Sequence, residues 1–102
     1  MTTERGPEEA CRLLCELRSI LQQHKERNWI RGIEAAIGEL EGESGIANQS
    51  KFDAARSIYK TMNQGGRGFA EYFIWHVNED ERIAANQKLD SLRSELWKVF
   101  EL

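Results

Sequence analysis

Apolar residues recur at three- and four-residue spacing over four stretches of the chain, which predicts four amphipathic helices. The expected helices cover about residues 7–25, 28–41, 51–63 and 79–101. The positions expected to face the core are Ala10, Leu13, Leu14, Leu17, Ile20, Leu21, His24, Trp29, Ile30, Ile33, Ala36, Ile37, Leu40, Phe52, Ala55, Ile58, Tyr59, Met62, Ala85, Leu89, Leu92, Leu96, Val99 and Phe100. We therefore expect an all-α fold, with four main helices in an antiparallel bundle and a short aromatic helix or turn between the third and the last.

Residues typical of helix starts precede these stretches. Pro7 is followed by two acids, which suit the first turn of a helix. Asn28 and Asn78 are expected caps of the second and last helices, and Ser50 with Asp53 fits the capping-box pattern before the third.

A glycine-rich loop, Gly65-Gly66-Arg67-Gly68, separates the third helix from the densest aromatic cluster of the chain, residues 69–77. Three glycines in four positions predict a sharp turn, with a positive φ at Gly66 or Gly68 or a close approach of two backbones. We expect Arg67 to be exposed.

The aromatic cluster is interpreted first as helical. At about 100° per residue, one face of such a helix carries Phe69, Tyr72, Phe73, His76 and Val77, while Ile74 and Trp75 point elsewhere. Phe69 and Phe73 are expected to point into the bundle. A strand here has no evident partner, because no other stretch alternates with a period of two.

Length and charge restrict the protein to a few classes. At 102 residues with a net charge of −3, the chain is expected to form one domain over residues 1–102, with residues 1–6 as a flexible tail. The charge is spread along the chain, so nucleic-acid binding is not expected. No apolar run suits a signal peptide or a membrane span, which predicts a cytoplasmic protein with Cys11 and Cys15 as reduced thiols.

Three kinds of chemistry are considered and set aside. The glycine loop offers backbone N–H groups to an anion but lacks the Gly-Lys-Ser/Thr ending of a P-loop. The two cysteines with His24 and His76 lack the spacing of a zinc site. Neither thiol belongs to a catalytic motif, so we expect no catalytic residue, no metal and no cofactor.

The spacing of the glycine loop, followed by Asn86-x-x-Leu89-x-x-Leu92-Arg93-x-x-Leu96-Trp97, resembles a family of small bacterial all-helical proteins, a domain of unknown function. That family carries a Gly-Gly-Met-Gly-Ser-Phe-Asn-Asp type of loop. Here Arg67 replaces the methionine, the serine is absent, and Glu71 corresponds to the acid. The resemblance implies a helical fold and a bacterial source but no activity.

The leading hypothesis is a small cytoplasmic protein-interaction or regulatory domain, of the immunity or antitoxin kind, that binds a protein partner or forms a homodimer. Small acidic domains of this kind can cover a basic partner surface. The alternative is a small-ligand-binding or enzymatic domain with a pocket at the glycine loop and the aromatic cluster. The residues expected to make the site are Arg67, Glu71, Trp75, His76 and Trp97.

Overall fold

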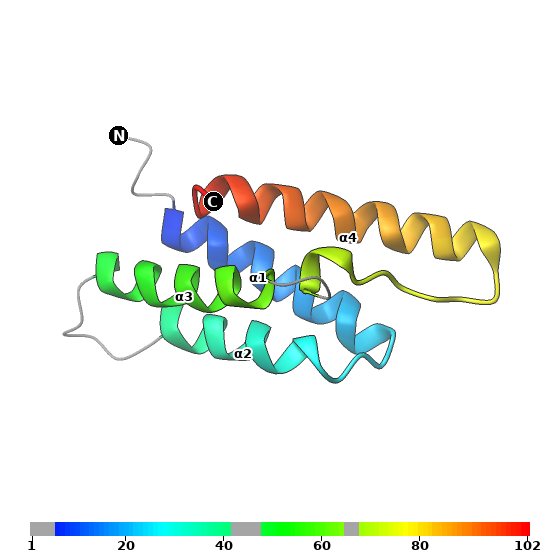
Figure 1. The fold of residues 1–102 in the computed structure, drawn as a ribbon, viewed down its shortest axis with the longest axis horizontal. Coiled ribbons are helices and arrows are strands. Elements are labelled where there is room, and N and C mark those ends of the chain that lie inside the picture. Colours follow the sequence, from blue (N-terminus) through cyan, green and yellow to red (C-terminus); the bar gives the residue numbers. More distant parts are fainter. Residues whose placement is uncertain (1–5, 42–47, 65–67) are drawn as a thin grey trace.

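The structure, a computed structural model, describes residues 6–41, 48–64 and 68–102. These residues form four α-helices and one 3₁₀ helix: α1 (Gly6–Gln23), α2 (Trp29–Leu40), α3 (Asn48–Met62), η2 (Phe69–Glu71) and α4 (Glu79–Val99). No strand occurs in the described ranges. Successive α-helices run in opposite directions, which confirms the all-α antiparallel bundle (Figure 1). Residues 1–5 of the predicted N-terminal tail, together with Gly65, Gly66 and Arg67, lie outside the described residues, whereas Gly6, the last residue of that tail, begins α1.

Helix α1 is the central element of the bundle, since it packs against α2, α3 and α4 (Figure 1). Its apolar stripe is buried as predicted, and the buried residues are Ala10, Leu13, Leu14, Leu17, Ile20 and Leu21. Each buried leucine contributes about 1.5–3 kcal/mol relative to an exposed one. None of the helices in the described ranges combines the length and the apolar composition needed to cross a bilayer.

Two of the predicted helix caps differ from the structure. Asn78 caps α4 as expected, because its side-chain oxygen accepts a hydrogen bond from the Glu81 N–H at 2.9 Å. The Asn28 side chain makes no such bond, and the Glu26 carboxylate instead accepts from the N–H groups of Asn28, Trp29 and Ile30 at 2.7–3.0 Å. A longer acidic side chain upstream reaches three N–H groups at once, which the sequence pattern does not reveal.

The predicted capping box of α3 is also wrong. The helix begins at Asn48, so Ser50 lies inside its first turn. Residues 46–49 contain no glycine or proline, so the helix can begin N-terminal to its predicted start at residue 51.

Gly68 is needed for space and not for a positive φ. Its φ of −76° and ψ of 177° are extended values, so the predicted left-handed conformation is wrong at this position. A Cβ atom here would lie 2.7 Å from the Gln64 carbonyl oxygen and 2.9 Å from the Asn63 carbonyl carbon. The close backbone approach expected of this loop is present, and it brings Phe69 into the core directly after α3.

We predict that Gly68→Ala destabilises the fold by about 1–3 kcal/mol, because the added methyl group meets backbone atoms that cannot rotate away. Gly38→Ala is the matched control, since a Cβ atom there meets nothing within 4 Å. On an exposed helical position it should stabilise the protein by about 1 kcal/mol. Thermal unfolding followed by circular dichroism should shift in opposite directions for the two variants, and equal shifts would refute this explanation.

Candidate functional site

The chain after η2 is extended and presents alternate side chains to opposite sides. Tyr72 has φ −68° and ψ 139°, and Figure 1 shows this segment running beside α4 before the helix begins. We call residues 72–77 the extended segment. Its inner row, Tyr72, Ile74 and His76, is buried or half-buried. Its outer row is 60% exposed at Phe73, 68% at Trp75 and 87% at Val77.

The helical interpretation of the aromatic cluster is therefore wrong beyond Glu71. Phe69 is buried as predicted, but Phe73 and Val77 point outward and Ile74 is only 1% exposed. An alternation of two is the period of a β-strand, and aromatic and β-branched residues favour that conformation.

Asn86 of α4 takes the place of the missing strand partner. Its side-chain oxygen accepts the Ile74 N–H at 2.7 Å, and its side-chain NH₂ donates to the Ile74 carbonyl at 2.8 Å. The second amide hydrogen goes to the Arg82 carbonyl, also at 2.8 Å. One side-chain amide thus repeats the two hydrogen bonds by which a residue of a neighbouring strand would pair with Ile74.

Two arginines on the same face of α4 hold the ends of the extended segment. Arg93 donates to the carbonyls of Phe69 and Tyr72 at 2.5 and 2.8 Å, and Arg82 donates to the His76 carbonyl at 3.3 Å. Spacings of four and eleven residues place Arg82, Asn86 and Arg93 on one helical face. We call these three residues the α4 clamp.

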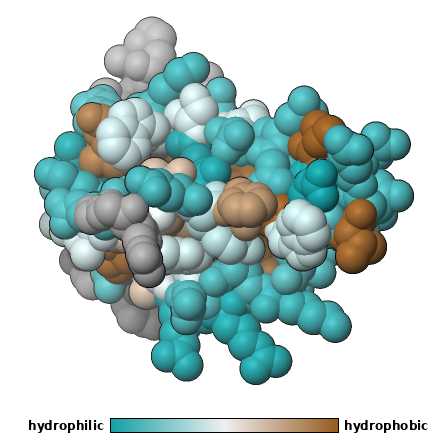
Figure 2. All heavy atoms as spheres, turned by 45° about the vertical axis from the view of Figure 1, so that its right-hand side comes forward, coloured by the Kyte–Doolittle hydropathy of each residue, from teal (hydrophilic) through white to brown (hydrophobic). Residues whose placement is uncertain are grey.

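The outer row forms an exposed apolar surface where the extended segment meets α4. In Figure 2, brown and pale spheres gather toward this end of the molecule, beside hydrophilic surface. Ile83 of α4, 47% exposed, adds to the exposed apolar residues. The Arg82 guanidinium carbon lies 4.9 Å from the centre of the Trp75 ring, which orients the indole through a cation–π contact.

The residues expected to form the site do not all meet. Glu71 and Trp75 are exposed, His76 lies in the inner row, and Arg67 is outside the described residues. Trp97, 48% exposed, lines a separate hollow of about 260 Å³ together with Ala70. Sequence reasoning placed Glu71, Trp75 and His76 on one segment and expected Trp75 to point away from the face of His76, which the structure bears out, since Trp75 is exposed and His76 is half-buried.

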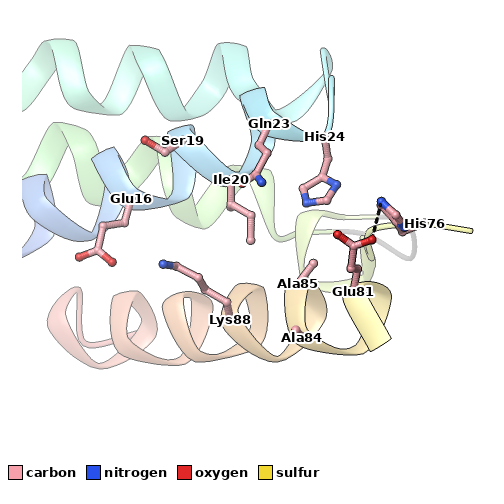
Figure 3. A pocket seen from close by; sticks show the side chains of 10 residues that line it. All are labelled: Glu16, Ser19, Ile20, Gln23, His24, His76, Glu81, Ala84, Ala85 and Lys88. Atoms are coloured by element: carbon pink, nitrogen blue, oxygen red, sulfur yellow. Dashed lines mark ion pairs between the residues drawn. The ribbon is translucent and has the colours of Figure 1, made fainter. Parts of the chain in front are cut away.

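His76 instead reaches a polar cleft between α1 and α4 with a volume of about 650 Å³ (Figure 3). Its ring lies 6.3 Å from that of His24, edge to face, and its Nε2 atom lies 3.6 Å from a Glu81 carboxylate oxygen. The other lining residues are Glu16, Ser19, Ile20, Gln23, Ala84, Ala85 and Lys88. Glu71 does not line the cleft, so the pocket envisaged for Glu71 and His76 together does not form there.

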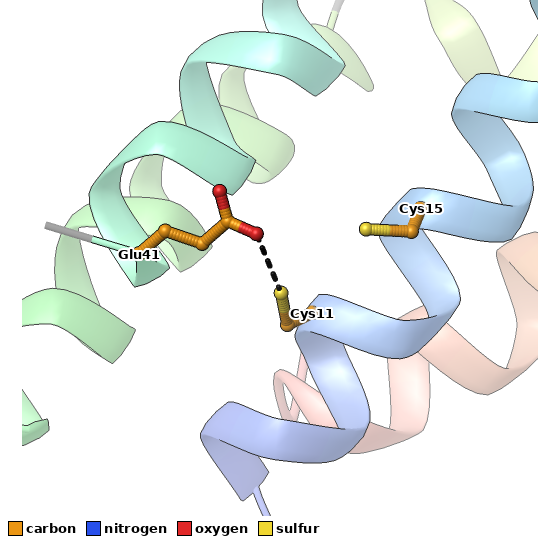
Figure 4. Close-up of side chains that lie close together, drawn as sticks. All are labelled: Cys11, Cys15 and Glu41. Atoms are coloured by element: carbon orange, nitrogen blue, oxygen red, sulfur yellow. Dashed lines mark hydrogen bonds between the residues drawn. The ribbon is translucent and has the colours of Figure 1, made fainter.

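A second polar cluster joins α1 to the end of α2. The Cys11 thiol lies 3.8 Å from a Glu41 carboxylate oxygen, and the donor atoms of Cys11, Cys15 and Glu41 all lie within 4.8 Å of one another (Figure 4). These are the described residues whose atoms suit a thiophilic metal ion. The sequence did not indicate the cluster, because Glu41 is distant from the cysteines along the chain.

The environment of Cys11 disfavours nucleophilic catalysis. Burial, followed by the neighbouring Cys15 and Glu41, raises the pKa of this thiol from 9.0 to about 11. Since the thiolate is the reactive form, Cys11 is a poor nucleophile at neutral pH. Both cysteines are free, as predicted.

Comparisons of the chain with protein-family models, with curated proteins and with solved structures find no match. The resemblance to the family with the glycine loop stays a prediction. In this chain the motif of the last helix that carries the resemblance contains Asn86 and Arg93, which are two of the three clamp residues. These two residues hold the extended segment against α4.

We predict that Asn86→Ala destabilises the protein by about 1–3 kcal/mol, because it leaves the partly buried N–H and C=O of Ile74 without partners. Gln87→Ala, at the exposed neighbouring position, is the control and should change stability little. Urea unfolding measures both. Indistinguishable midpoints for the two variants would show that the clamp does not hold the extended segment.

Proposed function

We propose that this protein is a protein-interaction domain and that it binds its partner through the outer row of the extended segment. The observation that carries the proposal is the alternation of the segment, in which Ile74 is 1% exposed between Phe73 at 60% and Trp75 at 68%. The fold has enough contacts to bury the inner row, yet it leaves two large aromatic side chains in water. Aromatic residues held in this way are common anchors of protein interfaces.

The rigidity of the backbone supports the same proposal. The α4 clamp fixes the segment through four hydrogen bonds to the backbone of Tyr72, Ile74 and His76, and a fifth holds the carbonyl of Phe69 in η2. Because the segment is already ordered, a partner does not have to supply the free energy of ordering it. An exposed apolar row on an ordered backbone is well suited to recognition.

The charges around the outer row indicate which partners fit. Glu71 precedes the row and Glu79, Asp80 and Glu81 follow it, and all four are exposed. These acids favour a basic partner surface by electrostatic complementarity. A small regulatory or neutralising protein of the immunity or antitoxin kind, acting in the cytoplasm, matches this surface.

The cleft at His24 and His76 supports a second candidate, the binding of a small polar ligand. Its volume of about 650 Å³ lies within the usual range for ligand sites, about 300–1,000 Å³. Its histidine, carboxylate and amine groups suit a ligand that carries charge. Such a ligand would leave the outer row uncovered, so the two candidates are separable by experiment.

We predict that a benzophenone amino acid in place of Trp75, introduced in living source cells, forms a covalent adduct with a partner protein on irradiation. The same replacement at Trp97 is the control, because Trp97 is also an exposed tryptophan, at 48%, but lines a different hollow. Phe73 replaced in this way should give an adduct of the same mass as that at position 75. Western blotting against a tag on the full chain measures all three.

Adducts at position 97 with none at 73 or 75 would contradict the proposed binding surface. If none of the three positions gives an adduct while a small molecule co-purifies with the chain and is lost in His24→Ala, the second candidate is favoured.

A further inference from the structure

We infer that the open edge of the extended segment accepts a β-strand from its partner, and that this strand is apolar at alternate positions with Lys or Arg at its ends. The inference rests on the proposed function and adds the manner of binding and the chemistry of the bound segment. It depends on the backbone of the segment, on the direction of its side chains and on the charges at its ends.

In an extended backbone, the N–H and C=O of one residue point to the same edge and those of the next residue to the opposite edge. The clamp occupies the edge formed by Tyr72, Ile74 and His76. In this geometry the N–H and C=O groups of Phe73 and Trp75 point to the other edge, and in the described part of the chain they have no hydrogen-bond partner. We call this the open edge. Val77, the last residue of the segment, lies at a bend.

An unpaired edge is the structural requirement for strand addition, in which main-chain hydrogen bonds provide affinity and alternate side chains provide specificity. The extended segment can offer both contributions, main-chain hydrogen bonds and side-chain contacts. The backbone of the open edge is ordered by the clamp on the opposite edge. The side chains of the same residues belong to the outer row, so a strand on the open edge would lay every second side chain beside Phe73 and Trp75.

The ends of the segment select the charge of the partner. From residue 70 to residue 82 the chain has four acids, Glu71, Glu79, Asp80 and Glu81, and one arginine, Arg82, whose guanidinium carbon lies 4.9 Å from the centre of the Trp75 ring. All four acids are exposed. A strand that pairs with the extended segment ends near Glu71, the last residue of η2, and near Glu79, the first residue of α4, where basic side chains gain attraction and acidic ones are repelled.

A second copy of this chain fits the open edge less well. Antiparallel pairing centred on Trp75 brings Glu71, at the end of η2, toward Glu79, at the start of α4 of the other copy, because the two residues are equally distant from the centre. Like charges brought close to each other in this way repel. The charges therefore favour a basic partner over self-association.

The test uses the ¹⁵N-labelled full chain and a nine-residue peptide, Lys-Thr-Val-Thr-Val-Thr-Val-Thr-Lys. Its valines have the alternate spacing of the outer row, and its lysines lie at the two ends, toward Glu71 and Glu79. One matched control carries Glu at both ends. The other is N-methylated at each valine, which removes the backbone donors of one edge and keeps the side chains.

We expect the lysine peptide to bind at up to millimolar concentration and to slow hydrogen exchange of the Phe73 and Trp75 amides. The glutamate peptide should bind about tenfold more weakly, because attraction at both ends becomes repulsion. The N-methylated peptide should not bind. Trp75→Ser, which alters an exposed side chain, should weaken binding of the lysine peptide without changing the fold.

Several results would overturn the inference. If the lysine peptide does not bind, or if the N-methylated peptide binds equally well, no strand is added. If either of these results is found and the benzophenone variants at positions 73 and 75 still form adducts in cells, the outer row binds a folded surface instead of a strand. The proposed function then still holds. A dimer mass in light scattering that Trp75→Ser abolishes would identify a second copy as the occupant instead.

Discussion

The pairing of Asn86 with the backbone of Ile74 is the interaction on which the candidate site depends. A single extended segment packed on helices leaves its N–H and C=O groups without partners, and burying them unpaired costs about 1–3 kcal/mol each. Asn86 satisfies both groups of Ile74, the only residue of the extended segment that is fully buried. Arg82 and Arg93 then bind the carbonyls on either side along the same edge.

This arrangement determines which side chains are available to a partner. Because one edge is fixed to α4 and Ile74 is held in the core, Phe73 and Trp75 have to face outward. Arg82 serves both purposes, since it binds the His76 carbonyl and also lies against the Trp75 ring. The stability of the segment and the exposure of the outer row thus have the same physical origin. Exposed acidic residues flank the outer row on both sides along the chain.

The periodicity of apolar residues was sufficient to predict the helical bundle, but it was not sufficient to predict the candidate site. The stripe of α1 from Ala10 to Leu21 is buried as expected, because three- and four-residue spacing directly reports one face of a helix. For residues 72–77 the same reasoning left a short helix or an irregular turn as alternatives and set a strand aside, since no second strand was evident. When a side-chain amide takes the place of a neighbouring strand, no periodic pattern in the sequence reveals it. Asn86 and Arg93 attracted notice only through a family resemblance, and the meeting of Glu41 with Cys11 depends on tertiary contacts that no local pattern encodes.

Amide hydrogen exchange of the free protein, resolved by NMR, tests the central claim most directly. We expect the Ile74 amide to exchange slowly, because Asn86 accepts its hydrogen in a buried position, while the amides of Phe73 and Trp75 on the open edge exchange rapidly. Asn86→Ala should remove the protection of Ile74. Uniform protection from Tyr72 to Val77, as in a continuous helix, or rapid exchange at Ile74 in the unaltered chain, would contradict the account.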